Sequence, residues 1–224
     1  MQLIRNHFYL RRIQSSLRFM IFSAVIAISA SFAIPAHADR LILAPEAETP
    51  APNAVQTEWL ISPSRHNDSY LWLSYSSNRT VEYELQRTGL SPDPEARYSL
   101  NIEYPFTIDF GPLPAISLGI RDILGTGNEH DAVYLVAGHS AGLSESAQKY
   151  IRHVRFTAGL GTGEMEGPFT GVELALTNGI ALQAEFYRHR PDFGITAPIL
   201  RGLQAQIASL NGRAFYGFTL HILH

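Results

Sequence analysis

Apolar and polar positions alternate most regularly between residues 154 and 186. Three runs there, residues 153–160, 171–176 and 180–187, carry an apolar side chain at every second position and small or polar ones between them. A period of two predicts strands with one apolar face. Asn178-Gly179 supplies the positive-φ pair of a tight hairpin between the last two runs. The stretch therefore predicts an antiparallel meander.

The same alternation recurs along most of the chain. It predicts further strands at residues 56–61, 69–77, 80–86, 97–104, 114–122, 132–139, 201–207 and 213–222. Residues 189–198 contain two prolines and are predicted to form a loop, and residues 143–151 are predicted to form about two helical turns. Since no long amphipathic helix separates these strands, we predict an all-β fold, an antiparallel up-and-down β-barrel of about 10–12 strands over residues 56–224.

The N-terminal residues have the pattern of an export signal. Four arginines and no acidic residue flank or precede an apolar run from Phe19 to Ile34, and Ala36-His37-Ala38 forms an A-x-A cleavage site. Residues 1–38 are therefore predicted to be a signal peptide that is removed on export. Residues 39–55 are rich in Pro, Ala and Glu and are predicted to be a flexible lead-in to the barrel.

Composition excludes several classes of function. Removal of residues 1–38 takes four arginines from the 17 Lys and Arg residues, which leaves 13 basic against 20 acidic residues. This acidic balance opposes binding to nucleic acid, which requires a basic face. The chain has no cysteine, so disulfides and thiolate metal sites are excluded. The histidines show no metal-ligand spacing, and we predict no metal, no cofactor and no enzymatic activity.

The alternation by itself does not determine which face of the barrel points inward. A soluble barrel buries its apolar face, whereas an outer-membrane barrel presents that face to lipid. The polar face is rich in glycine, as a crowded lumen would require, and lacks lysine, which solvated sheets usually carry. The glycines are Gly119, Gly159, Gly171, Gly202 and Gly217. We therefore expect a barrel of the outer-membrane type, with a soluble periplasmic binding module as the alternative.

Charges of both signs fall on the predicted polar face. We expect a lumen charge network made of Glu103, Arg121, Arg155, Glu173 and Glu185, with Arg201 as a further donor. Paired charges of this kind would make the lumen narrow or closed. Aromatic residues near strand ends are expected to form the girdles that meet membrane interfaces: Tyr98, Tyr104, Phe106, Phe169 and Tyr187.

Several short segments carry a resemblance to a known family. They are Y-S-L-N-I-E-Y-P-F (98–106), A-I-S-L-G-I-R-D-I-L-G-T-G (115–127), Y-L-V-A (134–137), V-R-F-T-A-G-L-G (154–161), G-V-E-L-A-L (171–176) and A-E-F (184–186). Over about residues 56–190 the chain resembles the YjbH family of Gram-negative outer-membrane β-barrel proteins, which are associated with exopolysaccharide production. The resemblance implies a location in the cell outer membrane, contact with its lipid, and exopolysaccharide or its export machinery as partners.

One segment suggests a different chemistry. Gly138-His139-Ser140-Ala141-Gly142 fits the G-x-S-x-G pattern of a nucleophile elbow, directly after an apolar run. A serine hydrolase would need the alternating β/α pattern and an upstream oxyanion segment, and neither is present. The segment is therefore interpreted as a turn that enters a loop, with a hydrolase as a third hypothesis.

Overall fold

The computed structural model describes residues 41–47, 53–63, 69–77, 81–89, 97–110, 112–126 and 131–223. The predicted signal peptide, residues 1–38, lies outside the described residues. The strands are β1 (Ala54–Ile61), β2 (Ser69–Ser77), β3 (Val81–Thr88), β4 (Arg97–Thr107), β5 (Ala115–Arg121), β6 (Ala132–Ser140), β7 (Ile151–Gly161), β8 (Gly167–Leu176), β9 (Ala181–Tyr187), β10 (Arg190–Leu200), β11 (Leu203–Leu210) and β12 (Arg213–Leu223). Two short helices are described, α2 (Glu145–Gln148) and the 3-10 turn η1 (Gly163–Met165).

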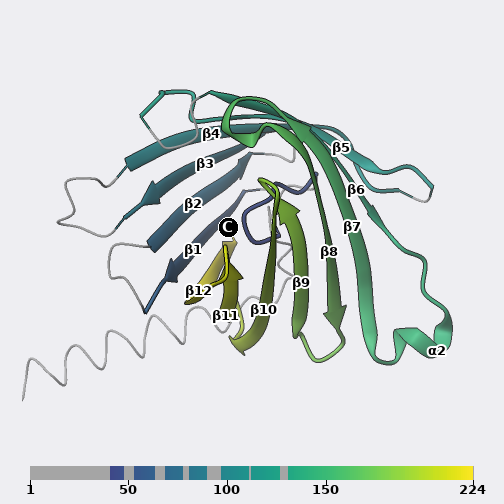
Figure 1. Ribbon diagram of the computed structural model, residues 1–224. Coiled ribbons are helices and arrows are strands. Elements are labelled where there is room, and N and C mark those ends of the chain that lie inside the picture. Colours follow the sequence, from purple (N-terminus) through teal and green to yellow (C-terminus); the bar gives the residue numbers. More distant parts are fainter. Residues whose placement is uncertain are drawn as a thin grey trace, which may run out of the picture.

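Each strand pairs antiparallel with its neighbours in the chain, and β12 pairs with β1 to close the ring (Figure 1). Ala54 lies opposite Leu223 and Ile61 opposite Tyr216, so the last strand returns to where the first begins. The predicted all-β, antiparallel up-and-down barrel is confirmed, with 12 strands. We call the end that carries the start of β1 the terminal end of the barrel, and the opposite end the far end.

The predicted loop at residues 189–198 is wrong, because residues 190–198 belong to β10 and only residue 189 lies in a turn. Its two prolines lie near the strand's ends, Pro191 opposite Phe186 and Pro198 opposite Gln204. The register with β11 shifts directly after Pro198. Proline cannot donate a ladder hydrogen bond and is tolerated at strand ends and bulges. Between the prolines, β10 alternates like the other strands, with Asp192 buried and Phe193 exposed.

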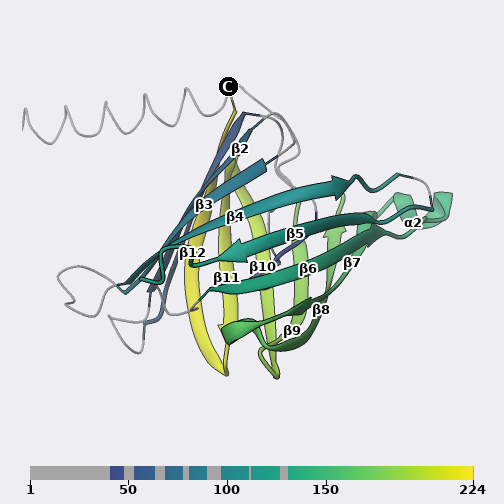
Figure 2. The same cartoon turned by 90° about the horizontal axis from the view of Figure 1, so that it is seen from above.

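The one α-helix in the described part of the chain lies at the predicted place, and the 3-10 turn η1 was not predicted. The helix expected over residues 143–151 is reduced to the four residues of α2, which projects beyond β6 and β7 in Figure 2. In the described part of the chain, no helix has the length and apolar character needed to cross a membrane.

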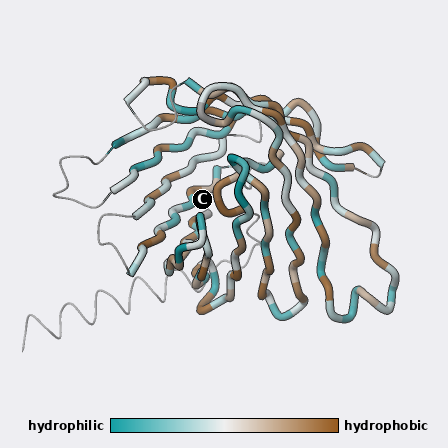
Figure 3. The backbone as a smooth tube through the Cα atoms, viewed as in Figure 1, coloured by the Kyte–Doolittle hydropathy of each residue, from teal (hydrophilic) through white to brown (hydrophobic). Residues whose placement is uncertain are grey.

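The strands turn their polar face inward and their apolar face outward. Figure 3 shows the alternation of hydrophilic and hydrophobic positions along the strands. In β3, Glu82, Glu84 and Gln86 are buried in the barrel, while Tyr83 and Leu85 between them are exposed outside it. The same inversion holds in β2, where Ser74 and Ser76 are buried and Leu71, Leu73 and Tyr75 are exposed. The interior is therefore the polar side of the sheet.

Two of the residues expected in aromatic girdles lie inside the barrel instead. Phe169 and Tyr187 are buried and pack edge to face, with ring centroids 6.3 Å apart. Within its own strand, each of the two occupies the same set of alternate positions as the inward polar residues. Closeness to a strand end does not reveal this facing. Tyr98, Tyr104 and Phe106 are exposed on the outside, as the expectation requires.

Gly119 illustrates how the crowded interior is packed. It lies opposite Tyr134 of β6, and a Cβ at position 119 would come within 2.0 Å of the Tyr134 ring. Because the Tyr134 hydroxyl also donates to Glu103 at 2.6 Å, the ring cannot shift freely.

Gly119→Val should therefore lower the free energy of unfolding by about 1–3 kcal/mol, the usual effect of overpacking. Urea unfolding followed by tryptophan fluorescence measures this change. Gly142→Val is the control, because nothing lies within 4 Å of a Cβ at position 142. Equal effects of the two variants would contradict the packing argument.

Candidate functional site

The candidate site is the interior of the barrel, where the N-terminal end of the described chain is enclosed. Residues 41–47 (Leu-Ile-Leu-Ala-Pro-Glu-Ala), called the plug below, lie inside the ring of strands in Figure 1. Six of the seven are buried, and Leu43 is partly buried. The backbone bends on itself, since the amide of Leu41 donates to the carbonyl of Ala44 at 3.0 Å. These residues differ from the flexible lead-in expected over residues 39–55.

Glu185 holds the plug through its backbone. Its carboxylate accepts hydrogen bonds from three consecutive amides, those of Ile42 (3.1 Å), Leu43 (3.0 Å) and Ala44 (3.0 Å). Glu185 is only 4% exposed, so these donors replace the water that the carboxylate would otherwise bind. Hydrogen bonds to a charged group are the stronger kind, and three of them fix the position of the bend.

The plug's carbonyl groups are bound from another part of the wall, on β5. Arg121 Nη2 donates to the carbonyl of Leu43 at 3.0 Å, and Ser117 Oγ donates to that of Ala47 at 2.7 Å. Arg121 also donates to the Tyr187 hydroxyl at 3.3 Å. Since Glu185 lies on β9 and Arg121 on β5, the plug spans the barrel between two distant strands.

The plug also supplies a charge of its own. Glu46 Oε2 lies 3.4 Å from Arg155 Nη1, and both side chains are almost fully buried. Glu173, which faces Arg155 across the β7–β8 ladder, forms hydrogen bonds with His153 Nε2 (2.8 Å) and Gln183 Nε2 (2.9 Å). The lumen charge network expected from the sequence thus includes a residue of the plug, the ion-pair partner Glu46 of Arg155.

All five residues of the expected lumen charge network are buried in the barrel: Glu103, Arg121, Arg155, Glu173 and Glu185. Arg121, Arg155 and Glu185 contact the plug directly. Glu103 accepts the hydroxyl of Tyr134 and lies opposite Glu82 in the β3–β4 ladder. Arg201 does not belong to this group, because it lies in the exposed turn between β10 and β11.

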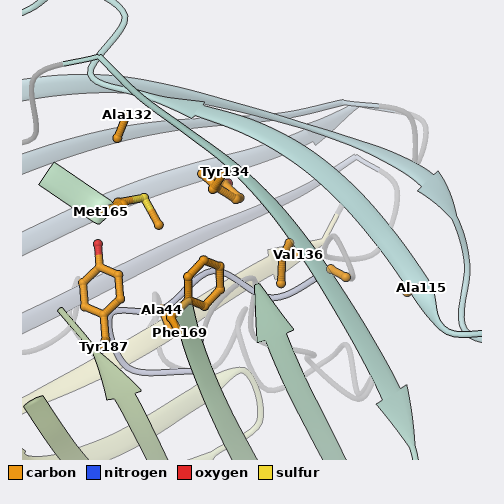
Figure 4. Close-up of a cluster of buried hydrophobic side chains, with 9 residues drawn as sticks. Ala44, Ala115, Ala132, Tyr134, Val136, Met165, Phe169 and Tyr187 are labelled. Atoms are coloured by element: carbon orange, nitrogen blue, oxygen red, sulfur yellow. The ribbon is translucent and has the colours of Figure 1, made fainter. Parts of the chain in front are cut away.

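Two glycines on the inner face make room for the plug. A Cβ at Gly171 would lie 2.0 Å from Cδ1 of Leu41, and a Cβ at Gly194 would lie 3.1 Å from the Ile42 side chain. Plug residues also join both apolar clusters of the interior. Ala44 packs with Phe169 and Tyr187 in the cluster shown in Figure 4, and Ile42 packs with Trp72 in the other.

Three cavities in the described interior are small, with volumes of about 40, 20 and 70 Å³. Each holds at most a few water molecules, since one water needs roughly 10–15 Å³ by this measure. The plug thus fills most of the space between the walls.

The G-x-S-x-G segment lies at the terminal end of β6. Asp109 Oδ1 is 2.9 Å from His139 Nδ1, and Asp109 Oδ2 accepts the backbone amide of Ser140 at 2.8 Å. Burial raises the pKa of Asp109, but hydrogen bonds from Ser140 and His139 outweigh it and hold the pKa below its ordinary value. Here the aspartate contacts the serine directly, whereas a hydrolase triad places the histidine between them.

Comparisons with known proteins add no family assignment. A scan against models of protein families finds no match, and a search of the curated proteins finds no match. Among the residues that the structure describes, no group of three or more His, Asp or Glu side chains is placed to hold a metal ion.

The sequence did not reveal the plug. Its apolar residues 41–44 begin two residues after the predicted signal peptide, and this short run before a stretch of Pro, Ala and Glu was the available signal.

We predict that Glu185→Gln loosens the plug. The amide keeps the shape of the side chain but turns an NH₂ group toward backbone donors. A buried donor that loses its acceptor costs about 1–3 kcal/mol, so the amides of residues 42–44 should exchange hydrogen about 5–100 times faster. Hydrogen exchange with mass spectrometry measures this. Glu84→Gln is the matched control, since Glu84 is an inward glutamate that accepts from Asn101. Unchanged exchange in Glu185→Gln would refute the assigned role.

Proposed function

We propose that this chain is an outer-membrane β-barrel protein whose lumen is closed by its own plug. We propose a structural or accessory role for it in the cell envelope. The observation that carries the proposal is the inverted arrangement of the barrel, with apolar side chains outside and polar side chains inside. A membrane-spanning barrel requires this arrangement, because its outer surface meets hydrocarbon.

Exposed apolar side chains occur on most strands of the ring. Leu85 of β3, Leu135 of β6, Ile195 of β10 and Ile207 of β11 are between 45% and 53% exposed. In water, so large an apolar surface would favour association, and monomeric soluble proteins seldom carry one. This opposes the alternative of a soluble periplasmic binding module, which would bury that face.

Exposed aromatic side chains occur toward both ends of the barrel. Toward the terminal end they are Tyr75, Tyr83, Tyr104 and Phe106, and toward the far end Tyr98, Phe186, Phe193 and Tyr216. Outer-membrane barrels carry such girdles where strands cross the two interfaces of the bilayer. The strands contain 7 to 11 residues, close to the length that a tilted membrane strand needs.

The resemblance to the YjbH family supports a narrower version of the proposal. On that basis the accessory role is in exopolysaccharide production or export, and the partners are exopolysaccharide or its export machinery. The closed lumen fits an accessory role better than that of a general diffusion pore.

Cell fractionation tests the proposed location. The protein should sediment with the outer membrane and dissolve only in detergent, because its outer surface is apolar. Release by osmotic shock, together with soluble periplasmic proteins, would overturn the proposal and favour the soluble module.

A charge on the outer face provides a second test. Leu135→Arg, near the middle of β6, should destabilise the protein in lipid bilayers by about 2–4 kcal/mol, the cost of an arginine at the bilayer midplane. Unfolding titrations in lipid vesicles measure the loss. Tyr150→Arg is the control, since Tyr150 lies in the β6–β7 connection and is 72% exposed. A similar stability of both variants would argue against a lipid-facing Leu135.

A further inference from the structure

Each of these three cavities is lined in part by a residue of the plug. The cavity at the terminal end is lined by Leu41 together with the rim residues Gly179 and His221. The cavity at the far end is lined by Leu43 together with Arg188 and Asn211. The third is lined by Pro45. The plug is thus the partition that all three have in common.

We infer that the plug closes a passage for small cations through the barrel. This inference rests on the proposed function, because a passage has meaning only in a barrel that spans a membrane. Withdrawal of the plug would join the terminal-end cavity to the far-end cavity, and a 12-stranded barrel is wide enough that inward side chains need not fill it.

The plug can leave without disturbing the barrel wall. The closed ladder is formed by β1 to β12 alone, so no strand pairing depends on residues 41–47. The attachments of the plug to the wall are hydrogen bonds, one ion pair and packing contacts. They are therefore reversible.

The net charge of the barrel's inner face determines which class of solute the passage would admit. Among the described residues of the strands, seven acidic side chains are buried in the interior against two arginines. The acidic residues are Glu58, Glu82, Glu84, Glu103, Glu173, Glu185 and Asp192, and the arginines are Arg121 and Arg155. Two further arginines, Arg152 and Arg188, line the end cavities, so acidic residues still outnumber arginines. A narrow passage with excess negative charge concentrates cations and excludes anions.

Planar bilayer recordings test the inference with the full chain. In one variant the seven plug residues are replaced by alternating Gly and Ser, so that chain length is kept while the Glu46–Arg155 ion pair and the packing of Leu41 and Ile42 on the wall are lost. Under a potassium chloride gradient, the unmodified protein should show little conductance. The variant should show stable open channels whose reversal potential lies toward that of potassium. No gain in conductance, or a preference for chloride, would overturn the inference.

A second substitution shows whether the current runs through the lumen. Glu82→Gln and Glu103→Gln, added to the plug variant, should shift the reversal potential toward zero while the channels still open. Glu145→Gln in the exposed helix α2 is the matched control and should leave the reversal potential unchanged. A reversal potential that does not respond to the lumen substitutions would place the current outside the barrel and refute the inference.

Failure of this inference and failure of the proposed function give different results. If the plug variant fractionates with the outer membrane and retains β-structure by circular dichroism but does not conduct, only the cation passage is refuted. If the unmodified protein is released by osmotic shock, the proposed function itself fails.

Discussion

Charged groups inside the closed barrel need hydrogen-bond or ion-pair partners, and this requirement governs the structure. A 12-stranded barrel with its polar face inward encloses carboxylates that cannot all reach water. Backbone amides of the plug supply donors to Glu185, and its carbonyls accept from Arg121 and Ser117. The plug also brings Glu46 to Arg155. The plug therefore does more than block the lumen, since it also supplies hydrogen-bond partners to the wall.

The strand pattern was predictable because it depends on local alternation. β2 was predicted with its observed bounds, and the meander of β7, β8 and β9 with nearly its observed extent. β10 was missed because its two prolines outweighed the alternation between them, and proline is costly only where a ladder bond is required. Burial of the lumen charges followed from the same alternation, since side-chain facing has a period of two.

The partners of those charges could not be predicted from the sequence. Arg155 faces Glu173 across the ladder, and the plug residue Glu46, 109 positions away in the chain, also forms an ion pair with it. The plug has neither strand periodicity nor a helical pattern, so its position depends on tertiary contacts alone. The inward direction of Phe169 and Tyr187 illustrates the same limit, because closeness to a strand end does not determine facing.

The pairing of β1 with β12 has a consequence for the order of folding. The plug precedes every strand in the chain, yet its walls are β5, β7 and β9, and the ring is complete only when residues 54–61 meet residues 216–223. Before that pairing the sheet has two open edges and no interior. The plug is thus synthesised before every strand but is enclosed last. The pairing of β1 with β12 closes the ring and also encloses the plug.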